Sequence, residues 1–210
     1  MRKLILNLAA LVLVSLLAQI AQAQQAKKVP LIGYLSATAD QKREAFRQGL
    51  RALGYVEGKN IIIEYRYLEG KTEPIPDLTA ELVRLNVDVI VTGSTLVAQA
   101  ARKLTTTIPI IVVGVGDPVA TGLVASLAHP GGNITGLSGL APELSGKRLE
   151  LLKEAFPKVS RVGVFWNPAS PSNALNWKET EAAARPAASK LQCLEVRSPD
   201  DFERVFRAAT

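Results

Sequence analysis

The chain of 210 residues has little of the side-chain chemistry that most enzymes use. It contains one cysteine, Cys193, and one histidine, His129. A single cysteine excludes a disulfide within the chain, and one Cys with one His cannot form a zinc site of the usual kind. The serine-hydrolase pattern G-x-S-x-G and the P-loop pattern G-x-x-x-x-G-K-[ST] are both absent. We therefore expect no enzyme activity, no metal and no cofactor.

Positive charge is present only in modest excess. Lys and Arg number 25 against 19 Asp and Glu, for a formal net charge of +6, and the basic residues are scattered along the chain. A nucleic-acid partner is therefore not indicated, because such proteins gather basic residues in one segment or on one face. Aromatic residues make up only 5% of the chain, so its core must be largely aliphatic.

The longest apolar run lies at the start of the chain. It extends over residues 4–17, follows Arg2 and Lys3, and is succeeded by the small-x-small sequence of residues 21–23. This arrangement predicts a secretory signal peptide over residues 1–23. The run of about 14 residues is shorter than the roughly 20 that span a bilayer. An uncleaved N-terminal anchor is the alternative; with cleavage, we expect the mature protein in the periplasm.

The remaining sequence alternates between strand-like and helix-like segments. β-branched apolar runs predict strands at residues 30–36, 60–67, 87–91, 108–114, 133–137, 161–166 and 191–196. Apolar residues at helical spacing predict helices at residues 40–54, 76–86, 95–104, 119–128, 142–156, 173–190 and 200–209. This order predicts an α/β protein with parallel sheets and helices on both faces. In it, Cys193 is expected to be a small buried residue of a strand.

A change in composition divides the mature sequence. Residues 130–146 are rich in Gly, Pro and Ser, as a connection between two units would be. We expect a first α/β lobe over residues 24–138 and a second over residues 139–210. Only two strands are predicted in the second lobe, so it is expected to be incomplete.

Polar residues follow several of the predicted strands. In open parallel sheets, ligands bind at the carboxyl ends of the strands. Ser36 follows the first strand, Ser94 and Thr95 follow the third, and Asn167 follows the sixth. Ser94 or Thr95 can cap the next helix, and the free N–H groups at that helix start can also receive a carboxylate. Both roles remain open.

The loop after the fourth strand carries an acid, Asp117, among glycines. Gly114 and Gly116 do not complete a G-x-G-x-x-G fingerprint, because Val119 stands at its last position, and Asp117 would repel a phosphate. Asp117 can cap the following segment, with Pro118 in its first turn, or can pair with a ligand ammonium. The two roles are compatible.

Several longer strings resemble a known family. GYLS, LGYVEGKN, GSTLVAQAA, VGDPVATGLVASLAHPGGNITGLS and RVGVFWNP, together with the predicted signal peptide, are similar to substrate-binding proteins of ABC transporters. The nearest group is the tryptophan/tyrosine-type, within the type I periplasmic-binding-protein fold. The resemblance covers the chain from about residue 29 to its end. DPVATGLV and PGGNITG are its most specific parts.

The resemblance implies two lobes that close, by a hinge near residues 138–140, on a small solute delivered to an ABC permease in the inner membrane. Its ligand-contacting loops would contain Ser94, Thr95, Asp117 and Asn167, with Ser36 as a further candidate. Aromatic-amino-acid members tend to carry an acid shortly after the Asn-Pro. This chain has Ser170 there.

The sequence thus predicts an exported solute-binding protein that binds a small polar or amino-acid-like ligand without chemistry. A periplasmic sensor domain that is not coupled to transport is the alternative. A hydrolase using a strand-end serine is a third hypothesis, but it lacks a plausible triad. Nothing in the sequence specifies an oligomer, and we expect a monomer.

Overall fold

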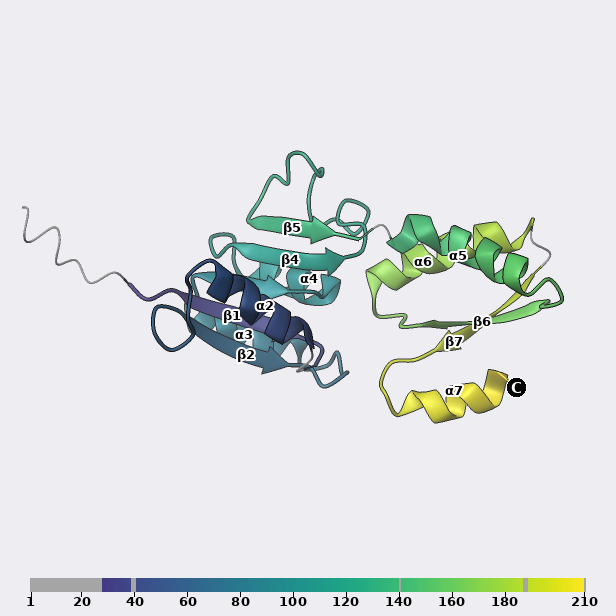
Figure 1. The fold of residues 1–210 in the computed structure, drawn as a ribbon, viewed down its shortest axis with the longest axis horizontal. Helices are drawn as coiled ribbons and strands as arrows, with labels where there is room; N and C mark the ends of the chain where they lie inside the picture. The colour runs from purple at the N-terminus through teal and green to yellow at the C-terminus, as the bar shows by residue number, and fades with distance from the viewer. Residues whose placement is uncertain (1–27, 39–40, 140, 187–188, 210) are drawn as a thin grey trace, which may run out of the picture.

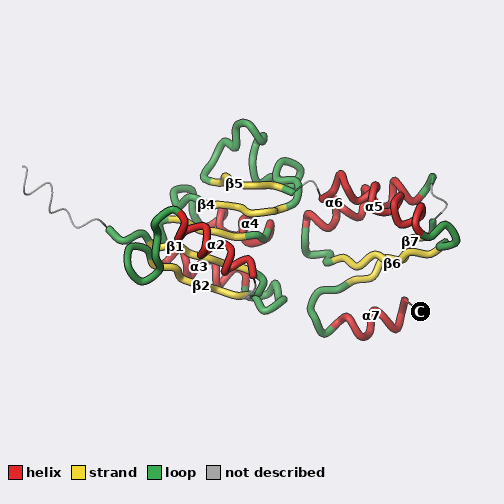
Figure 2. The backbone as a smooth tube through the Cα atoms, viewed as in Figure 1, coloured by secondary structure: helices red, strands yellow, loops and turns green. Residues whose placement is uncertain are grey.

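The computed structural model describes residues 28–38, 41–139, 141–186 and 189–209, so the predicted signal peptide lies outside the described residues. Figures 1 and 2 show two sheets with their helices. The elements are β1 (Leu31–Ser36), α2 (Gln41–Ala52), β2 (Ile62–Tyr67), α3 (Ile75–Arg84), β3 (Val89–Thr92), α4 (Thr95–Leu104), β4 (Ile110–Val115), β5 (Ile134–Ser138), α5 (Ala141–Ala155), β6 (Arg161–Trp166), α6 (Pro171–Ala184), β7 (Lys190–Glu195) and α7 (Asp201–Ala209). None of these helices is long and apolar enough to cross a membrane.

The N-terminal sheet contains five strands in the order β2-β1-β3-β4-β5, and each neighbouring pair is parallel. Tyr34 and Val91 on one face belong to a buried cluster against which Phe46 of α2 packs. Ile90 on the other face shares a second buried cluster with Leu82 of α3 and with residues of α4. The α/β class, with a parallel sheet and helices on both faces, is confirmed.

The sheet is less well covered at β4 and β5. Val113 and Leu137 are paired in register on the α2 side of the sheet and are 51% and 70% exposed. The uninterrupted apolar sequence of β4 therefore does not reflect burial on both faces along its whole length.

The prediction of a helix over residues 119–128 is wrong. A single turn follows β4, in which Oδ1 of Asp117 accepts the N–H groups of Val119 and Ala120 at 2.9 and 3.0 Å. The turn ends at Gly122, whose φ of +70° lies outside the helical region. Glycine adopts this conformation readily, so the chain leaves the helical path after one turn.

The C-terminal sheet consists of the parallel pair β6 and β7. Figure 1 shows α5 and α6 on one side of this pair and α7 on the other. Successive strand residues face opposite sides. The Phe165 ring accordingly lies 5.9 and 5.1 Å from those of Phe202 and Phe206 in α7, whereas Trp166 lies 6.2 Å from Trp177 of α6.

Two predicted details of this half are wrong. α6 ends at Ala184 rather than near residue 190, because Pro186 cannot continue a helix and disfavours the helical conformation at the residue before it. Cys193 is exposed rather than buried. A two-stranded sheet makes β7 an edge strand, and its neighbours do not cover that side chain.

Leu53 is also placed wrongly by helical spacing. Spacing alone would put it on the same helical face as Phe46 and Leu50, but α2 ends at Ala52 and Leu53 is 76% exposed. The turn that follows, with Gly54 at φ +84°, directs the chain away from the helix axis.

The ends of β1, β3 and β4 determine where the site lies. Leu35 pairs in register with Thr92, and Thr92 with Val112, so the loops after these strands begin side by side. Figure 1 shows this edge of the N-terminal sheet facing the part of the molecule that contains α6.

Candidate ligand-binding cleft

A cavity of about 420 Å³ lies at the carboxyl edge of the N-terminal sheet and is lined from both sheets. We call it the cleft. One wall comes from the loop after β3, the start of α4 and the glycine loop after β4. The opposite wall comes from the loop after β6 and the start of α6. The lining side chains that matter below are Lys71, Ser94, Thr95, Asn167, Ser170, Ser172 and Asn173.

The two walls touch at one hydroxyl pair. Oγ1 of Thr95 and Oγ of Ser172 lie 2.9 Å apart, within hydrogen-bonding distance. Thr95 is only 6% exposed, so this contact is well inside the molecule. A Cβ atom added at Gly116 would lie 2.6 Å from Oγ of Ser172. Only glycine allows the loop after β4 to approach α6 this closely.

Helices begin on both sides of the cleft. Ser94 is the N-cap of α4, and its Oγ accepts the N–H of Val97 at 3.4 Å. Ser170 is the N-cap of α6 but makes no side-chain cap hydrogen bond. The first N–H groups of a helix lack partners within the helix and lie at the positive end of its dipole. The geometry therefore suits a carboxylate or another small anion.

Asn167 shapes the opposite wall. Its Oδ1 accepts the N–H of Ala169 at 2.9 Å, which fixes the turn between β6 and α6. Pro171 then occupies the first helical turn, where its missing N–H is not needed.

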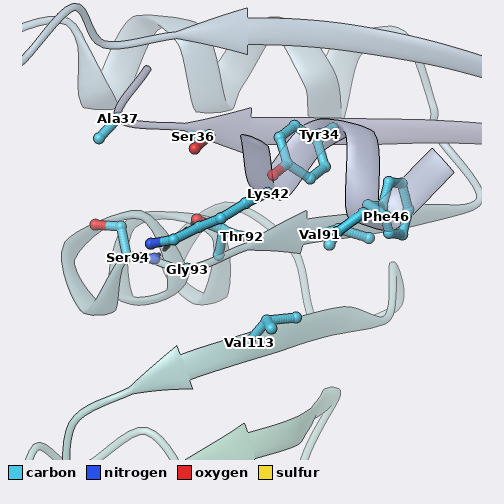
Figure 3. Close-up of a pocket in the computed structure, with 11 residues that line it drawn as sticks. Tyr34, Ser36, Ala37, Lys42, Phe46, Val91, Thr92, Gly93, Ser94 and Val113 are labelled. Atoms are coloured by element: carbon cyan, nitrogen blue, oxygen red, sulfur yellow. Dashed lines mark hydrogen bonds between the residues drawn. The ribbon is translucent and has the colours of Figure 1, made fainter. Parts of the chain in front are cut away.

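A second cavity, of about 380 Å³, adjoins the cleft. We call it the side chamber. It lies between α2 and strands β1, β3 and β4, and Figure 3 shows the side chains that surround it. The side chamber and the cleft share Ala37, Gly93 and Ser94 in their linings.

The structure brings four of the five predicted site residues to these cavities. Ser94, Thr95 and Asn167 line the cleft, whereas Ser36 lines the side chamber together with Ser94. Asp117 lines neither cavity. It acts as the cap of the turn after β4, the first of its two predicted roles. Its neighbour Gly116 lines the cleft in its place.

Sequence reasoning missed Ser172 and Asn173 of α6 and the two lysines, Lys42 and Lys71. The sequence Pro-Ala-Ser-Pro-Ser-Asn at residues 168–173 is partly recognisable as a helix start and so carried a signal for α6. The two lysines carried no such signal. Lys42 lies in α2 and Lys71 in the loop after β2, and only the folded structure shows that each reaches a cavity.

The shifted pKa values lie outside the cleft lining. Burial, assisted by the negative charge of Glu57, raises the pKa of Tyr65 to about 12. This phenol stands behind the side chamber, with its ring 5.7 Å from that of Tyr34. It therefore stays neutral at physiological pH. Among the described residues, no group of three His, Cys, Asp or Glu side chains could hold a metal ion.

Comparison with known proteins shows what the chain is similar to. A family model described as "ABC transporter substrate binding protein" matches residues 28–210. The chain belongs to this family. Among curated proteins it is similar to a tyrosine-binding protein of Clostridioides difficile (strain R20291), with 38% identity over 128 residues, which are 61% of this chain and 36% of that protein.

Two solved structures have a similar fold. A conserved domain protein from Vibrio cholerae O1 biovar El Tor is 34% identical, with a TM-score of 0.76 over 86% of this chain and 62% of that one. An ABC domain from Streptococcus pneumoniae in complex with L-Trp is 24% identical, with a TM-score of 0.73 over 85% and 61%. The latter shows the fold alone. The fold is the type I periplasmic-binding-protein fold, and this chain spans less than two thirds of each relative.

Proposed function

We propose that this chain is the ligand-binding part of an exported solute-binding protein of an ABC importer. Its two lobes, residues 24–138 and 139–210, would close on a small polar or amino-acid-like solute and release it unchanged to a permease in the inner membrane. The observation that carries this proposal is the cleft itself, which brings Ser94, Thr95 and Asn167 together from separate sheets. Family membership and the predicted signal peptide support the transport role and the periplasmic location.

The chemistry of the cleft favours a solute with a carboxylate. The starts of α4 and α6, the positive ends of their helix dipoles, line the cleft, and Lys71 is the charged residue among the described lining. N–H groups and an ammonium group bind a carboxylate by charge-assisted hydrogen bonds. The curated relative named for tyrosine is consistent with a solute of this size.

The same groups favour binding over catalysis. The described lining consists of hydroxyls, amides, glycines, aliphatic side chains and one lysine. A nucleophile needs an adjacent base that is itself held in place by a third group. His129, the candidate base, is exposed in the loop after β4, where its backbone N–H bonds Oγ of Ser126 at 3.0 Å.

The position of the Thr95–Ser172 contact supports closure of the lobes around solute. This hydroxyl pair joins the walls directly, and a solute that contacted both walls would stabilise the closed arrangement in proportion to its preference for it. Residue 140, in the predicted hinge, lies outside the described residues.

Titration calorimetry against a panel of amino acids and small carboxylates tests the proposal. We expect at least one solute to bind with a Kd in the micromolar range or tighter. Asn173→Trp places a large ring in the cleft and should abolish binding, whereas Lys178→Trp, on an exposed part of the same helix, should leave it unchanged. A folded protein that binds no solute of the panel would refute the proposal.

A further inference from the structure

Two glycines at the edge of the N-terminal sheet lie against elements of the C-terminal half. Gly116, in the loop after β4, faces the start of α6, and a Cβ atom added to it would lie 2.6 Å from Oγ and 2.7 Å from Cβ of Ser172. Gly70, in the loop after β2, faces the loop before α7, and an added Cβ would lie 2.9 Å from Cδ and Cγ of Pro199. Real Cβ atoms do not approach other atoms so closely, so both contacts require glycine.

The two glycine contacts lie on either side of the cleft. In the sheet order β2-β1-β3-β4-β5, the ends of β2 and β4 flank those of β1 and β3, and both Gly70 and Gly116 line the cleft. Figure 1 shows the loop after β2 extending towards the loop between β7 and α7. Thr95, which follows β3, shares its hydrogen bond with Ser172 between these two points. The two halves therefore meet at three places around one cavity.

The three contacts differ in what they contribute. A hydrogen bond between two neutral hydroxyl groups changes an equilibrium by roughly two- to tenfold, so the Thr95–Ser172 pair favours contact between the halves without locking them. The glycine contacts act through steric fit instead. With hydrogen in place of a side chain, the backbone after β4 can lie against Ser172, and any larger group would push α6 away.

We infer, on the basis of the proposed function, that Gly70, Gly116 and the Thr95–Ser172 pair form a latch that defines the closed cleft. The two glycines set how closely the halves approach, and the hydroxyl pair stabilises that approach relative to the open arrangement. Gly116 is thus a positioning residue, because it controls the width of the cleft through the place of α6. A solute that contacts both walls closes the latch in proportion to its preference for the closed arrangement.

A pair of introduced cysteines tests the latch on the full chain without any solute. Cys193→Ser first removes the natural cysteine, which is exposed. Thr95→Cys with Ser172→Cys then places two sulfur atoms where the hydroxyl oxygens lie 2.9 Å apart, within reach of a disulfide after small side-chain rotations. Oxidised glutathione accepts the two electrons that the thiols lose as they join. Alkylation of the remaining thiols followed by mass spectrometry gives the rate of cross-linking.

The matched control moves one cysteine along the same helix. Lys178 is exposed on α6 and does not line the cleft, so Lys178→Cys replaces Ser172→Cys in the control pair. We expect the Thr95–Ser172 pair to cross-link at least about tenfold faster, because its two thiols are held at a higher effective concentration. Equal rates in the two pairs would overturn the inference.

A glycine variant of the cysteine pair tests the steric part of the latch. Gly116→Ala should slow cross-linking at least about tenfold, because its Cβ meets the Cβ atom at position 172 and not only the end of a side chain. Gly132→Ala is the control, since nothing lies within 4 Å of its added Cβ, and neither glycine has a positive φ. Equal rates in the two variants would exclude Gly116 from the latch. Far-ultraviolet circular dichroism verifies that both are folded.

The solute dependence of cross-linking distinguishes a latch from a permanent contact. The amino acid or carboxylate of the calorimetric panel that binds most tightly should speed cross-linking of the Thr95–Ser172 pair at least about threefold at saturation, because it favours the closed arrangement. An unchanged rate would show that the contact does not respond to solute and would overturn the latch.

Calorimetry and cross-linking together separate this inference from the proposed function. If a solute of the panel binds but the cysteine pair cross-links no faster than its control, the latch is refuted and the proposed function stands. If the pair cross-links rapidly but the folded protein binds no solute of the panel, the proposed function is refuted, whereas the contact between the halves is supported.

Discussion

The N-terminal and C-terminal sheets obey the same parallel α/β rules but differ in how well they bury their residues. Both buried clusters found in the described residues belong to the N-terminal sheet and its helices, and Leu35, Leu82 and Ile90 there are completely inaccessible. In the C-terminal half, Phe165 and Phe206 remain 42% and 56% exposed although their rings touch. Strand number explains the difference, because two strands cover too little of the helices packed on them.

The aromatic residues allow the two halves to be observed separately. All four tyrosines lie in the N-terminal half, at positions 34, 55, 65 and 67, whereas both tryptophans, Trp166 and Trp177, lie in the C-terminal half. Tryptophan fluorescence therefore reports on the C-terminal sheet, and tyrosine signals report on the N-terminal sheet.

The largest expected effect is a cavity in the N-terminal core. Leu82→Ala should lower the free energy of unfolding by about 3 kcal/mol or more, because the side chain is completely buried and packs tightly over Gly33. Urea unfolding followed through the tyrosines should show the loss, with a smaller shift in the tryptophan transition. The exposed Leu151→Ala, by contrast, should change stability by about 0.5 kcal/mol or less. Equal shifts of both transitions would mean that the halves unfold as one unit.

Gly136 and Gly163 differ in what an added Cβ atom would meet, which is rigid backbone at one and an adaptable side chain at the other. Gly136 of β5 has φ +141°, and a Cβ there would lie 2.0 Å from the backbone oxygen of Val112. At Gly163 of β6 the nearest atom is instead the end of the Leu194 side chain, at 2.8 Å.

Because backbone atoms of a paired strand cannot move aside, Gly136→Ala should destabilise by about 2–3 kcal/mol. Gly163→Ala should cost about 1 kcal/mol, since Leu194 can change rotamer. Thermal unfolding of the two variants gives the comparison. A larger loss for Gly163→Ala would contradict the view that the Leu194 side chain adapts more easily than the backbone of Val112.

Alkaline pH should destabilise the N-terminal half through Tyr65. The folded-state pKa of Tyr65 is about 12 against an ordinary value of 10.0, because burial disfavours the phenolate. Stability from this group is complete below pH 10 and is lost as the pH rises towards 12. Tyr65→Phe should remove this part of the pH dependence in urea midpoints, measured by circular dichroism. Tyr55→Phe, at a 42% exposed position, should retain it.

Acid pH should have a smaller effect, and in the C-terminal half it should act through Asp201. Arg204 and the N–H groups of Arg197 and Ser198 hydrogen-bond Asp201 and lower its pKa to about 2 from an ordinary 3.8. The stability it provides is present above pH 3.8 and is lost as the pH falls towards 2. Solvent screens this exposed group, so the change should be slight.

Tryptophan-monitored unfolding of Asp201→Asn should lack this acid-dependent step, whereas Asp200→Asn should keep it. An acid transition that is unchanged in Asp201→Asn would assign the step to another carboxylate.

The sequence predicted regular elements well where hydrophobic spacing and caps agreed. The strand at residues 161–166 and the helix at residues 95–104 have the predicted bounds, the latter because Ser94 caps its start. The predictions failed where a local conformation overrode the spacing, as at Gly122 after β4. They also failed at Cys193, whose exposure depends on how many strands surround it.

The candidate site was predictable in its parts but incomplete. Ser94, Thr95 and Asn167 follow strands, and the rule for parallel sheets was enough to select them. Ser172 was missed because its role depends on a contact with Thr95 across 77 positions of the chain. Asp117 was selected because its carboxylate could pair with a ligand ammonium, but the carboxylate caps its own turn instead.

By itself, the sequence determined the order of strands and helices, the parallel class and the polar character of the strand ends. These properties follow from spacing and capping, which act over a few residues. Only the tertiary structure decided which loops face each other, that Asp117 stays out of the cleft, and that an apolar chamber with a lysine at its rim adjoins it. Such relations depend on distances between elements remote in the chain, and local patterns contain no measure of those distances.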